Sequence, residues 1–505
     1  MNETFDVVVA GAGPVGLMLA CELRLGGAEV LVVERLTEPD PTIKAGGVNV
    51  PTAQAFDRRG MLPDLLEQQN ATVQRIRAAG MFPSAAGQRL PIGGHFAGIV
   101  LRTDNIDFDD PAFAELGPGA EVVLVAQQAI EATLARRAAE LGIAVRRGVE
   151  LTEFGDDETG VTVHLGDSIV RADWLVGCDG GRSTVRKLAG FDFPGLDVEI
   201  TGHQAVVEMT GAQGLRPGWN TTETGIYTSG PTPGRIVTVE LDGPPADRAT
   251  PVTAAELQAS LRAVSGVPVE ITAVHSATRF TDNTRQVTDY RKGRVLLAGD
   301  AAHVHPPFGG QGLNLGIGDA VNLGWKLAAV VRGDASDALL DSYTAERHPV
   351  GAWVLEWTRA QVALMRLDQR SKALRAVMTE LLATRDGTTA IFKKISGVLH
   401  RYDLGGGHDL IGAVTPDIEL SDGSRLGAHF ADGRAILLDL ADSAELRTIA
   451  QPWSDVVRVV TAKPVAPREL SAMLIRPDGY VAWAADSGDR DGLVEALRRW
   501  FGDKS

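Results

Sequence analysis

Glycine, acidic and proline residues gather in one stretch of this sequence, residues 299–314. The stretch starts Gly-Asp-Ala-Ala-His, passes two prolines, and ends Gly-Gly-Gln-Gly-Leu-Asn. An acidic residue at a strand end, a turn rich in glycine and a helix N-terminus can together hold phosphate and polyol groups. The apolar run 294–298 predicts the strand, and an amphipathic helix is expected from near Gly312 past Asp319 and Lys326.

A second stretch of this kind lies near the N-terminus. The apolar run 5–10 predicts a buried parallel strand, and Pro14 suits the first position of a helix expected over 14–25. A further strand, 29–33, ends in Glu34, about 20 residues after the turn, where dinucleotide folds bind ribose hydroxyls. This order favours dinucleotide binding over a merely tight turn, but does not separate FAD from NAD(P). The candidate residues are Gly11, Gly13, Pro14, Val15, Gly16, Glu34 and Arg35.

A third stretch follows the apolar run 173–178, which predicts another buried strand. Asp179 and Gly180 come directly after it, and Ser183 and Arg186 lie near the start of an expected helix. On its own, this pattern is explained equally well by a strand-to-helix connection with Ser183 as the N-cap.

The three stretches, by their order and spacing, resemble the motifs of the class A flavin-dependent aromatic monooxygenases, the para-hydroxybenzoate hydroxylase type, over about residues 1–360. The resemblance implies that the motif of Asp179 and Gly180, with Ser183 and Arg186 after them, touches both FAD and the transient NAD(P)H. It also implies that Asp300 holds ribityl and ribose hydroxyls, with prolines beside the flavin ring and 309–314 near the pyrophosphate and isoalloxazine. The cofactor residues of this last stretch are Asp300, Pro307, Gly310, Gly312, Leu313 and Asn314.

Four further side chains have candidate roles, two by the same resemblance and two by the chemistry of histidine. Gln127 matches a glutamine that contacts the flavin in relatives, or is a polar residue at a helix start. Lys44 stands where many relatives have an arginine that contacts the mobile flavin, and lysine keeps the charge but loses the planar fork. His303 and His305 invite a role as general base, although the motif explains His303 as a structural residue. No catalytic side chain is assigned, because a hydroxylated substrate ring carries its own activating group.

The resemblance implies an α/β fold in which a dinucleotide-binding, Rossmann-like FAD domain carries an inserted β-sheet substrate domain. We expect an FAD domain over 1–75, 100–185 and 280–360, a substrate domain over 76–99 and 186–279, a helical linker over 361–404 and a C-terminal domain over 405–505. The C-terminal domain resembles the thioredoxin-like domain of the polyketide and rifampicin hydroxylase branch. It has no cysteine, which excludes a dithiol role and leaves packing or subunit contact. Candidate aromatic contacts to a substrate, which core positions explain as well, are Trp219, Tyr227 and Phe280.

The amino-acid composition limits the binding partners and the cellular compartment that we expect for this protein. The formal charge of −16 argues against nucleic acid or an anionic membrane as a partner. Cys21 and Cys178 form no CxxC pair, so we expect neither a disulfide framework nor a metal site, and place the chain in a reducing cytoplasm. No apolar run is long enough to cross a bilayer. We expect a monomer or homodimer whose partners are small molecules only, namely an aromatic compound and O₂.

The leading hypothesis is an FAD-dependent monooxygenase that consumes NADPH or NADH and inserts one oxygen atom from O₂ into a polycyclic, polyketide-type aromatic substrate. An antibiotic-inactivating hydroxylase or a Baeyer–Villiger-type oxygenase stays open, because fold and motifs do not describe the pocket. A non-catalytic flavoprotein that binds an aromatic ligand is a further alternative, against which the NAD(P)H motif argues. A flavin halogenase is disfavoured, because Trp353 and Trp357 do not form that family's paired-tryptophan motif.

Overall fold

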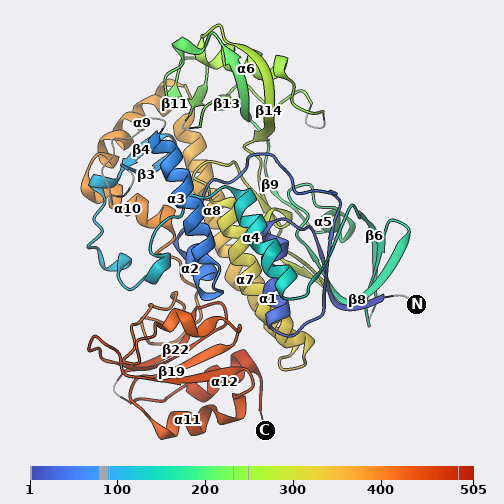
Figure 1. Cartoon of the computed structure of the whole chain (residues 1–505), viewed down its shortest axis with the longest axis vertical. Coiled ribbons are helices and arrows are strands. Elements are labelled where there is room, and N and C mark those ends of the chain that lie inside the picture. Colours follow the sequence, from blue (N-terminus) through green and yellow to red (C-terminus); the bar gives the residue numbers. More distant parts are fainter. Residues whose placement is uncertain are drawn as a thin grey trace.

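A computed structural model of the chain describes residues 3–78, 89, 91–157, 159–230, 232–247, 250–486 and 488–504 (Figure 1). Part of the predicted segment 76–99, namely 79–88 and 90, lies outside the described residues. The fold is mixed α/β, with a parallel sheet at its core and further sheets around it, as the sequence predicts.

The core sheet has the strand order β16–β17–β8–β1–β2–β5. Its strands are β1 (Glu3–Ala10), β2 (Val30–Glu34), β5 (Ala144–Arg147), β8 (Ser168–Gly177), β16 (Arg291–Lys292) and β17 (Val295–Leu297). β1 runs parallel to β2 and β8, and β17 runs parallel to β8. The hairpin of β6 (Leu151–Asp157) and β7 (Gly160–Leu165) pairs with β8. α1 (Pro14–Leu25) begins at its proline and packs against α7 (Gly312–Val331) and α4 (Gln127–Glu140).

A second sheet, antiparallel and five-stranded, lies at the top of Figure 1. Its strands, in spatial order, are β11 (Gly218–Thr221), β12 (Ile226–Ser229), β13 (Arg235–Glu240), β10 (Thr201–Thr210) and β14 (Glu270–Thr281). α6 (Ala254–Ser265) covers one face and shares an apolar cluster with it. A small sheet of β9 (Gly195–Leu196), β15 (Thr284–Gln286) and β18 (His303–Val304) joins the chain on both sides of the insertion.

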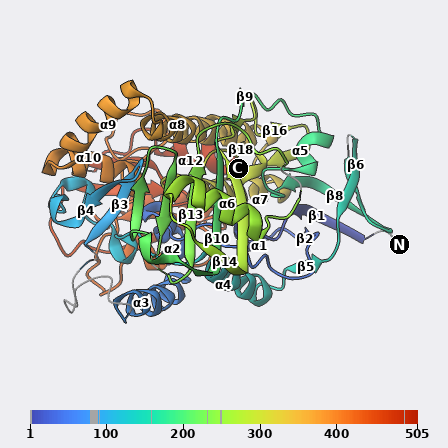
Figure 2. The same cartoon turned by 90° about the horizontal axis from the view of Figure 1, so that it is seen from above.

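Helices fill the middle of the molecule between the outer sheets, and α9 (Gln369–Leu382) and α10 (Arg385–Ser396) lie on its outer side (Figures 1 and 2). α8 (Asp341–Met365) packs against α7 and leads into α9 and α10. α9 and α10 contact the hairpin of β3 (Ile92–Phe96) and β4 (Ile99–Arg102). α2 (Val50–Arg58) contacts α7, α3 (Leu62–Ala78) contacts α2 and α4, and α5 (Thr184–Leu188) follows β8. No helix in the described part of the chain is both long and apolar enough to cross a membrane.

The C-terminal region forms a four-stranded sheet at the bottom of Figure 1, with the strand order β20–β19–β21–β22. Its elements are β19 (Ala435–Asp439), α11 (Ala444–Ala450), β20 (Val457–Thr461), β21 (Leu470–Ile475), β22 (Val481–Asp486) and α12 (Leu493–Phe501). Apolar side chains of α7 and α8, among them Trp325, Val350 and Val354, belong to the cluster under this sheet. The C-terminal core is therefore continuous with the helices that lead from the nucleotide motifs.

Candidate cofactor and active site

The three predicted motifs meet at the carboxyl edge of the core sheet. β1 ends at Ala10, β8 at Gly177 and β17 at Leu297, and the parallel pairing sets Ala10 opposite Gly177 and Gly177 opposite Leu297. Each strand is followed directly by one of the motifs. This edge of an open parallel sheet is where α/β folds bind their ligands.

Two glycines of the first turn are required by the protein itself, whereas Gly13 faces open space. Gly11 has a φ of +109°, and a methyl group there would lie 2.4 Å from the carbonyl oxygen of Cys178. A methyl group on Gly16 would lie 2.0 Å from the carbonyl oxygen of Gly11. Nothing described lies within 4 Å of that position on Gly13, the N-cap of α1, and no described side chain caps the helix there. The first amides of α1, which begins with Pro14 and Val15, can therefore meet an anionic group.

Glu34 closes the first turn. Its Oε2 accepts a hydrogen bond from the amide of Ala12 at 2.9 Å, and its Oε1 accepts one from Leu36 at 2.9 Å. Each carboxylate oxygen keeps a further lone pair, so Glu34 can also accept a ribose hydroxyl. Arg35 is exposed directly after it.

The Asp179 motif caps α5 and is tied to the Asp300 turn. Ser183 is the N-cap, as the alternative interpretation predicts, and its Oγ accepts from the amide of Arg186 at 2.9 Å. Asp179 Oδ2 accepts from two α5 amides at 2.6 and 3.1 Å, while Oδ1 is buried with no hydrogen-bond partner among the described residues. The guanidinium of Arg186 donates to the carbonyl oxygen of Ala301 at 2.9 Å. Gly180 has a φ of +79° and faces open space.

The Asp300 turn is held from behind by a buried carboxylate. Asp319 Oδ2 accepts from the amide of Gly299 at 3.0 Å and lies 2.7 Å from His303 Nε2. Both His303 and Asp319 are fully buried, which agrees with the structural interpretation of His303. Asp300 itself is exposed. Because the turn is fixed by Asp319, the Asp300 carboxylate is free to face a ligand.

His305 points an acceptor toward the same turn. Its Nδ1 lies 2.8 Å from the carbonyl oxygen of Pro306, which only accepts, so Nδ1 carries the proton. Burial lowers the pKa of His305, so the ring is neutral and Nε2 is an acceptor. Nε2 is buried with no partner among the residues described, 3.2 Å from where a methyl group on Gly312 would sit. The sequence offers a general base as the role of this histidine, and the geometry instead makes it a candidate hydrogen-bond acceptor for the ligand.

The end of the third motif divides into exposed backbone and buried side chains. Pro307 and Gly310 are exposed, and Gly310, with a φ of +63°, faces open space. Asn314 is buried: its Oδ1 accepts from the amide of Asn49 at 2.8 Å and its Nδ2 donates to Gly310 at 2.9 Å. Leu313 belongs to the apolar core. The sequence-assigned contacts of Leu313 and Asn314 with a cofactor therefore depend on their backbone atoms.

Lys44 lies on the loop after β2, and Gln127, the first residue of α4, bonds to the residue that follows Lys44. Lys44 Nζ lies 2.9 Å from Asp40, and the lysine side chain is 46% exposed. Gln127 donates to Glu131 at 2.8 Å and accepts from the amide of Ala45 at 3.4 Å. Both side chains thus have protein partners, and their contact with a cofactor stays a prediction.

An aromatic cluster lies between the five-stranded sheet and the prolines of the third motif. The ring of Phe308 lies 6.2 Å from Trp219 and 6.0 Å from Phe280, edge to face in both pairs. Phe96 and Trp357 join the same apolar cluster. Tyr227, in contrast, packs under α6 on the opposite face of the sheet, so its prediction as a substrate contact is wrong and its core interpretation is right. Strand alternation alone decides which face a side chain occupies.

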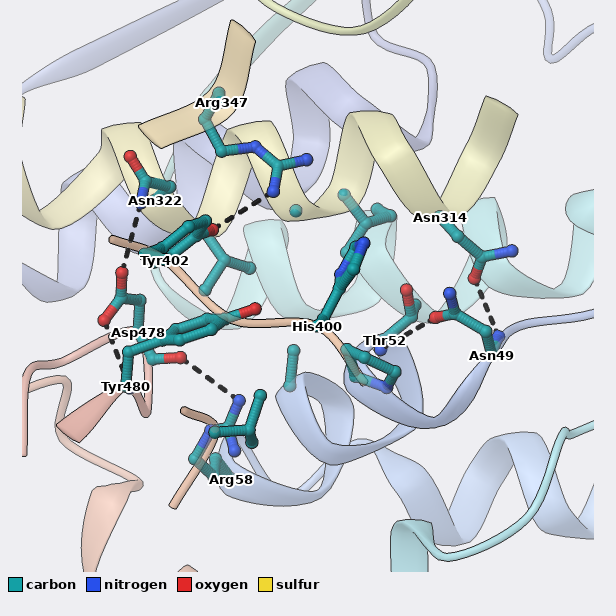
Figure 3. Close-up of a pocket in the computed structure, with 16 residues that line it drawn as sticks. Asn49, Thr52, Arg58, Asn314, Asn322, Arg347, His400, Tyr402, Asp478 and Tyr480 are labelled. Atoms are coloured by element: carbon teal, nitrogen blue, oxygen red, sulfur yellow. Dashed lines mark hydrogen bonds between the residues drawn. The ribbon is translucent and has the colours of Figure 1, made fainter. Parts of the chain in front are cut away.

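The polar side of α7 is buried, which differs from the amphipathic helix expected at this place. Asp319 and Lys326 are fully buried and Asn322 is 1% exposed. α8 and the turn between β21 and β22 supply their partners. A cavity of about 30 Å³, lined by both polar and apolar side chains and large enough for a water molecule, lies beside this row and contacts Asn314 (Figure 3). Sequence reasoning missed these buried charges because the elements that cover them lie far along the chain.

Taken together, these features fit a bound FAD. The open positions at Gly13, Gly180 and Gly310 leave room for a ligand beside the backbone. The uncapped first turn of α1 suits its pyrophosphate, and Asp300 suits its polyol hydroxyls. Asp179 Oδ1 and His305 Nε2 are buried acceptors that lack a donor among the described residues. A ligand that donates hydrogen bonds to these two atoms would satisfy them.

Comparison with known proteins shows the family to which the chain belongs. The model of the FAD binding domain family matches residues 4–358, and that of the aromatic-ring hydroxylase C-terminal domain matches residues 408–503. The chain is 41% identical over 530 residues to a 12-dehydrotetracycline 5-monooxygenase/anhydrotetracycline 6-monooxygenase of Streptomyces rimosus. It is also 41% identical over 505 residues to a rifampicin monooxygenase of Streptomyces venezuelae, and each alignment covers 99% of both chains.

A solved anhydrotetracycline hydroxylase from Streptomyces rimosus has the same fold, with a TM-score of 0.87 at 39% identity, over 99% of this chain and 100% of that one. The similarity therefore includes the C-terminal domain as well as the nucleotide motifs. This chain belongs to the FAD-dependent aromatic-ring hydroxylases and is a flavin monooxygenase.

Proposed function

We propose that this monooxygenase uses NAD(P)H and O₂ to hydroxylate a polycyclic aromatic compound of the polyketide type. The observation that carries the proposal is the aromatic cluster around Phe308, which directly follows the prolines of the cofactor motif. A cluster of aromatic side chains favours a large fused ring system over a single small ring, because the larger system offers more surface for stacking. The tetracycline-oxidising relative, similar from end to end, supports the same substrate class.

Within this proposal each group has a defined task. When bound, FAD would supply the redox chemistry, which is the uptake of electrons from NAD(P)H and the activation of O₂. The amides of the Gly11–Gly16 turn and of α7 bind and orient the cofactor, with Glu34 and Asp300 on its hydroxyls. Phe308, Trp219 and Phe280 orient the substrate ring and exclude water from the reacting atoms. We propose residues 186–279, which include most of the inserted sheet, and residues 76–99, which include β3, as the substrate domain. α9 and α10 contact the β3–β4 hairpin beside it.

NADPH consumption tests the proposal directly. Purified holoprotein is incubated with NADPH or NADH and with anhydrotetracycline, rifampicin or para-hydroxybenzoate, and products are analysed by mass spectrometry. We expect anhydrotetracycline to stimulate NAD(P)H oxidation and to gain one oxygen atom, and para-hydroxybenzoate to do neither. No stimulation by any polycyclic compound in such a panel would contradict the proposal.

A second function is favoured by the rifampicin monooxygenase relative, which is as similar as the tetracycline one. The enzyme would then inactivate an aromatic antibiotic. In the same assay, turnover of rifampicin without turnover of anhydrotetracycline selects this alternative. Product structure separates hydroxylation from Baeyer–Villiger insertion, because only the latter places oxygen between two ring carbons.

We further propose that the enzyme works in the cytoplasm, where NAD(P)H is available, as a monomer or homodimer without nucleic-acid or membrane partners. Its two cysteines are free thiols in the structure. Burial raises the pKa of Cys21 to about 12, so this thiol is unreactive near neutral pH. Light scattering of the holoprotein measures the oligomeric state.

A further inference from the structure

Two adjacent residues of α8 link the C-terminal domain to the cofactor motifs. Arg347 faces the turn that carries Asp300, and Glu346 faces the turn between β21 and β22, residues 476–480. Arg347 is 1% exposed and Glu346 5% exposed. Buried charges of this kind are costly unless every partner is in place.

On the cofactor side, the guanidinium of Arg347 anchors the carboxylate that holds the Asp300 turn. Arg347 Nε donates to Asp319 Oδ1 at 2.7 Å, and the other oxygen of Asp319 holds Gly299 and His303. Arg347 also donates to the carbonyl oxygen of Leu315 at 2.9 Å, in the first turn of α7. One arginine thus fixes both the acidic turn and the glycine-rich start of α7.

On the far side, Arg476 of the C-terminal domain completes the same network. It donates to both oxygens of Glu346, at 2.8 and 2.7 Å, and Glu346 also pairs with Lys326 at 3.0 Å. A second bridge runs through Tyr402, whose hydroxyl accepts from Arg347 at 3.1 Å. The ring of Tyr402 lies 4.1 Å from that of Tyr480, in the same C-terminal turn (Figure 3).

We propose that Arg476 is a positioning residue for the FAD site, and that the C-terminal domain acts as a structural part of that site. Without Arg476, Glu346 and Asp478 lose a buried partner and α8 shifts, which moves Arg347 and with it Asp319 and the Asp300 turn. This assigns a role to a domain that has no redox cysteine. The inference rests on the proposed contact between Asp300 and FAD.

The test measures FAD affinity, by fluorescence titration of protein stripped of flavin, together with the melting temperature and the visible flavin spectrum. We expect Arg476→Met to raise the FAD Kd about tenfold and to shift the spectrum, and Arg476→Lys to restore part of both. Arg447→Met is the control for loss of an arginine elsewhere in the same domain: Arg447, which is 42% exposed, pairs with Asp439 and Asp442. It should lower the melting temperature without changing the Kd by more than about twofold.

An unchanged Kd and spectrum in folded Arg476→Met, or an equal change in Arg447→Met, would overturn the inference. If Arg476→Met does not fold, Tyr402→Phe decides: it removes one hydroxyl, and an FAD Kd raised about threefold supports the inference while an unchanged Kd overturns it. The assay contains no substrate, so a failed hydroxylation leaves it intact. Absence of FAD binding by the unaltered protein would instead refute the proposed function.

Discussion

At the scale of single residues, Gly13 separates the needs of the cofactor from those of the fold. Its surroundings are open within the described protein, so a larger side chain there meets only a ligand. We expect Gly13→Val to weaken FAD binding at least about tenfold, because the pyrophosphate approaches this backbone. The melting temperature of the apoprotein should stay unchanged.

Gly407→Val is the control for this substitution, since Gly407 also faces open space but lies far from the motifs. It should alter neither FAD titration nor melting. If the Gly13→Val protein binds FAD as tightly as the unaltered chain, the pyrophosphate must bind elsewhere.

Glu346 gives a prediction for acid pH. Burial alone would raise its pKa, but Arg476 and Lys326 lower it from 4.5 to about 2. Because the folded pKa lies below the unfolded one, this carboxylate stabilises the fold above pH 4.5, and that contribution is lost as the pH falls through 4.5 to about 2. Glu346→Gln lacks this titration. Its unfolding free energy in urea should therefore fall less steeply across this window; two parallel curves would contradict the assignment.

Residue types in the three motifs were predictable because local backbone geometry demands them. Gly11 needs a positive φ, and Pro14 starts a helix. The role of His305 could not be predicted, since its neutral ring and unpartnered Nε2 depend on burial by the folded chain.

At the scale of elements, the two faces of the five-stranded sheet have different tasks. Phe280 faces Phe308 and the cofactor motif, whereas Tyr227 faces α6. We expect Phe280→Ala to raise the KM for anhydrotetracycline about tenfold, because the substrate ring loses an aromatic contact. The variant should also release more hydrogen peroxide per NADPH consumed. Tyr227→Phe, on the other face, should leave KM and peroxide release unchanged. Equal effects of both substitutions would show that the substrate does not bind on the Phe280 face of the sheet.

Most element boundaries followed from local signals. α1 covers its predicted residues, and α7 begins at Gly312 as expected. β8 starts earlier than the apolar run, at Ser168, because its first half pairs with β7, a partner that periodicity does not reveal. The sequence predicts the polar row of α7 as one side of an amphipathic helix, since nothing local shows that α8 and a distant turn cover it.

At the scale of the whole molecule, the shared core predicts cooperative behaviour. Trp500 of α12 is 2% exposed and packs with Trp325 of α7 at 6.3 Å between ring centroids. Trp500→Ala should cost about 3 to 5 kcal/mol of unfolding free energy. It should also bring FAD release and loss of secondary structure to the same lower temperature, in flavin fluorescence and circular dichroism. Early melting of the C-terminal domain with FAD still bound would show that the domains are independent.

The central claim is that the three motifs form one FAD site that passes an oxygen atom from O₂ to an aromatic substrate. Mass spectrometry after turnover of anhydrotetracycline with NADPH under isotope-labelled O₂ tests it most directly. We predict a product that carries one labelled oxygen atom. A product that gains unlabelled oxygen from water, or that changes without gaining oxygen, would contradict the claim.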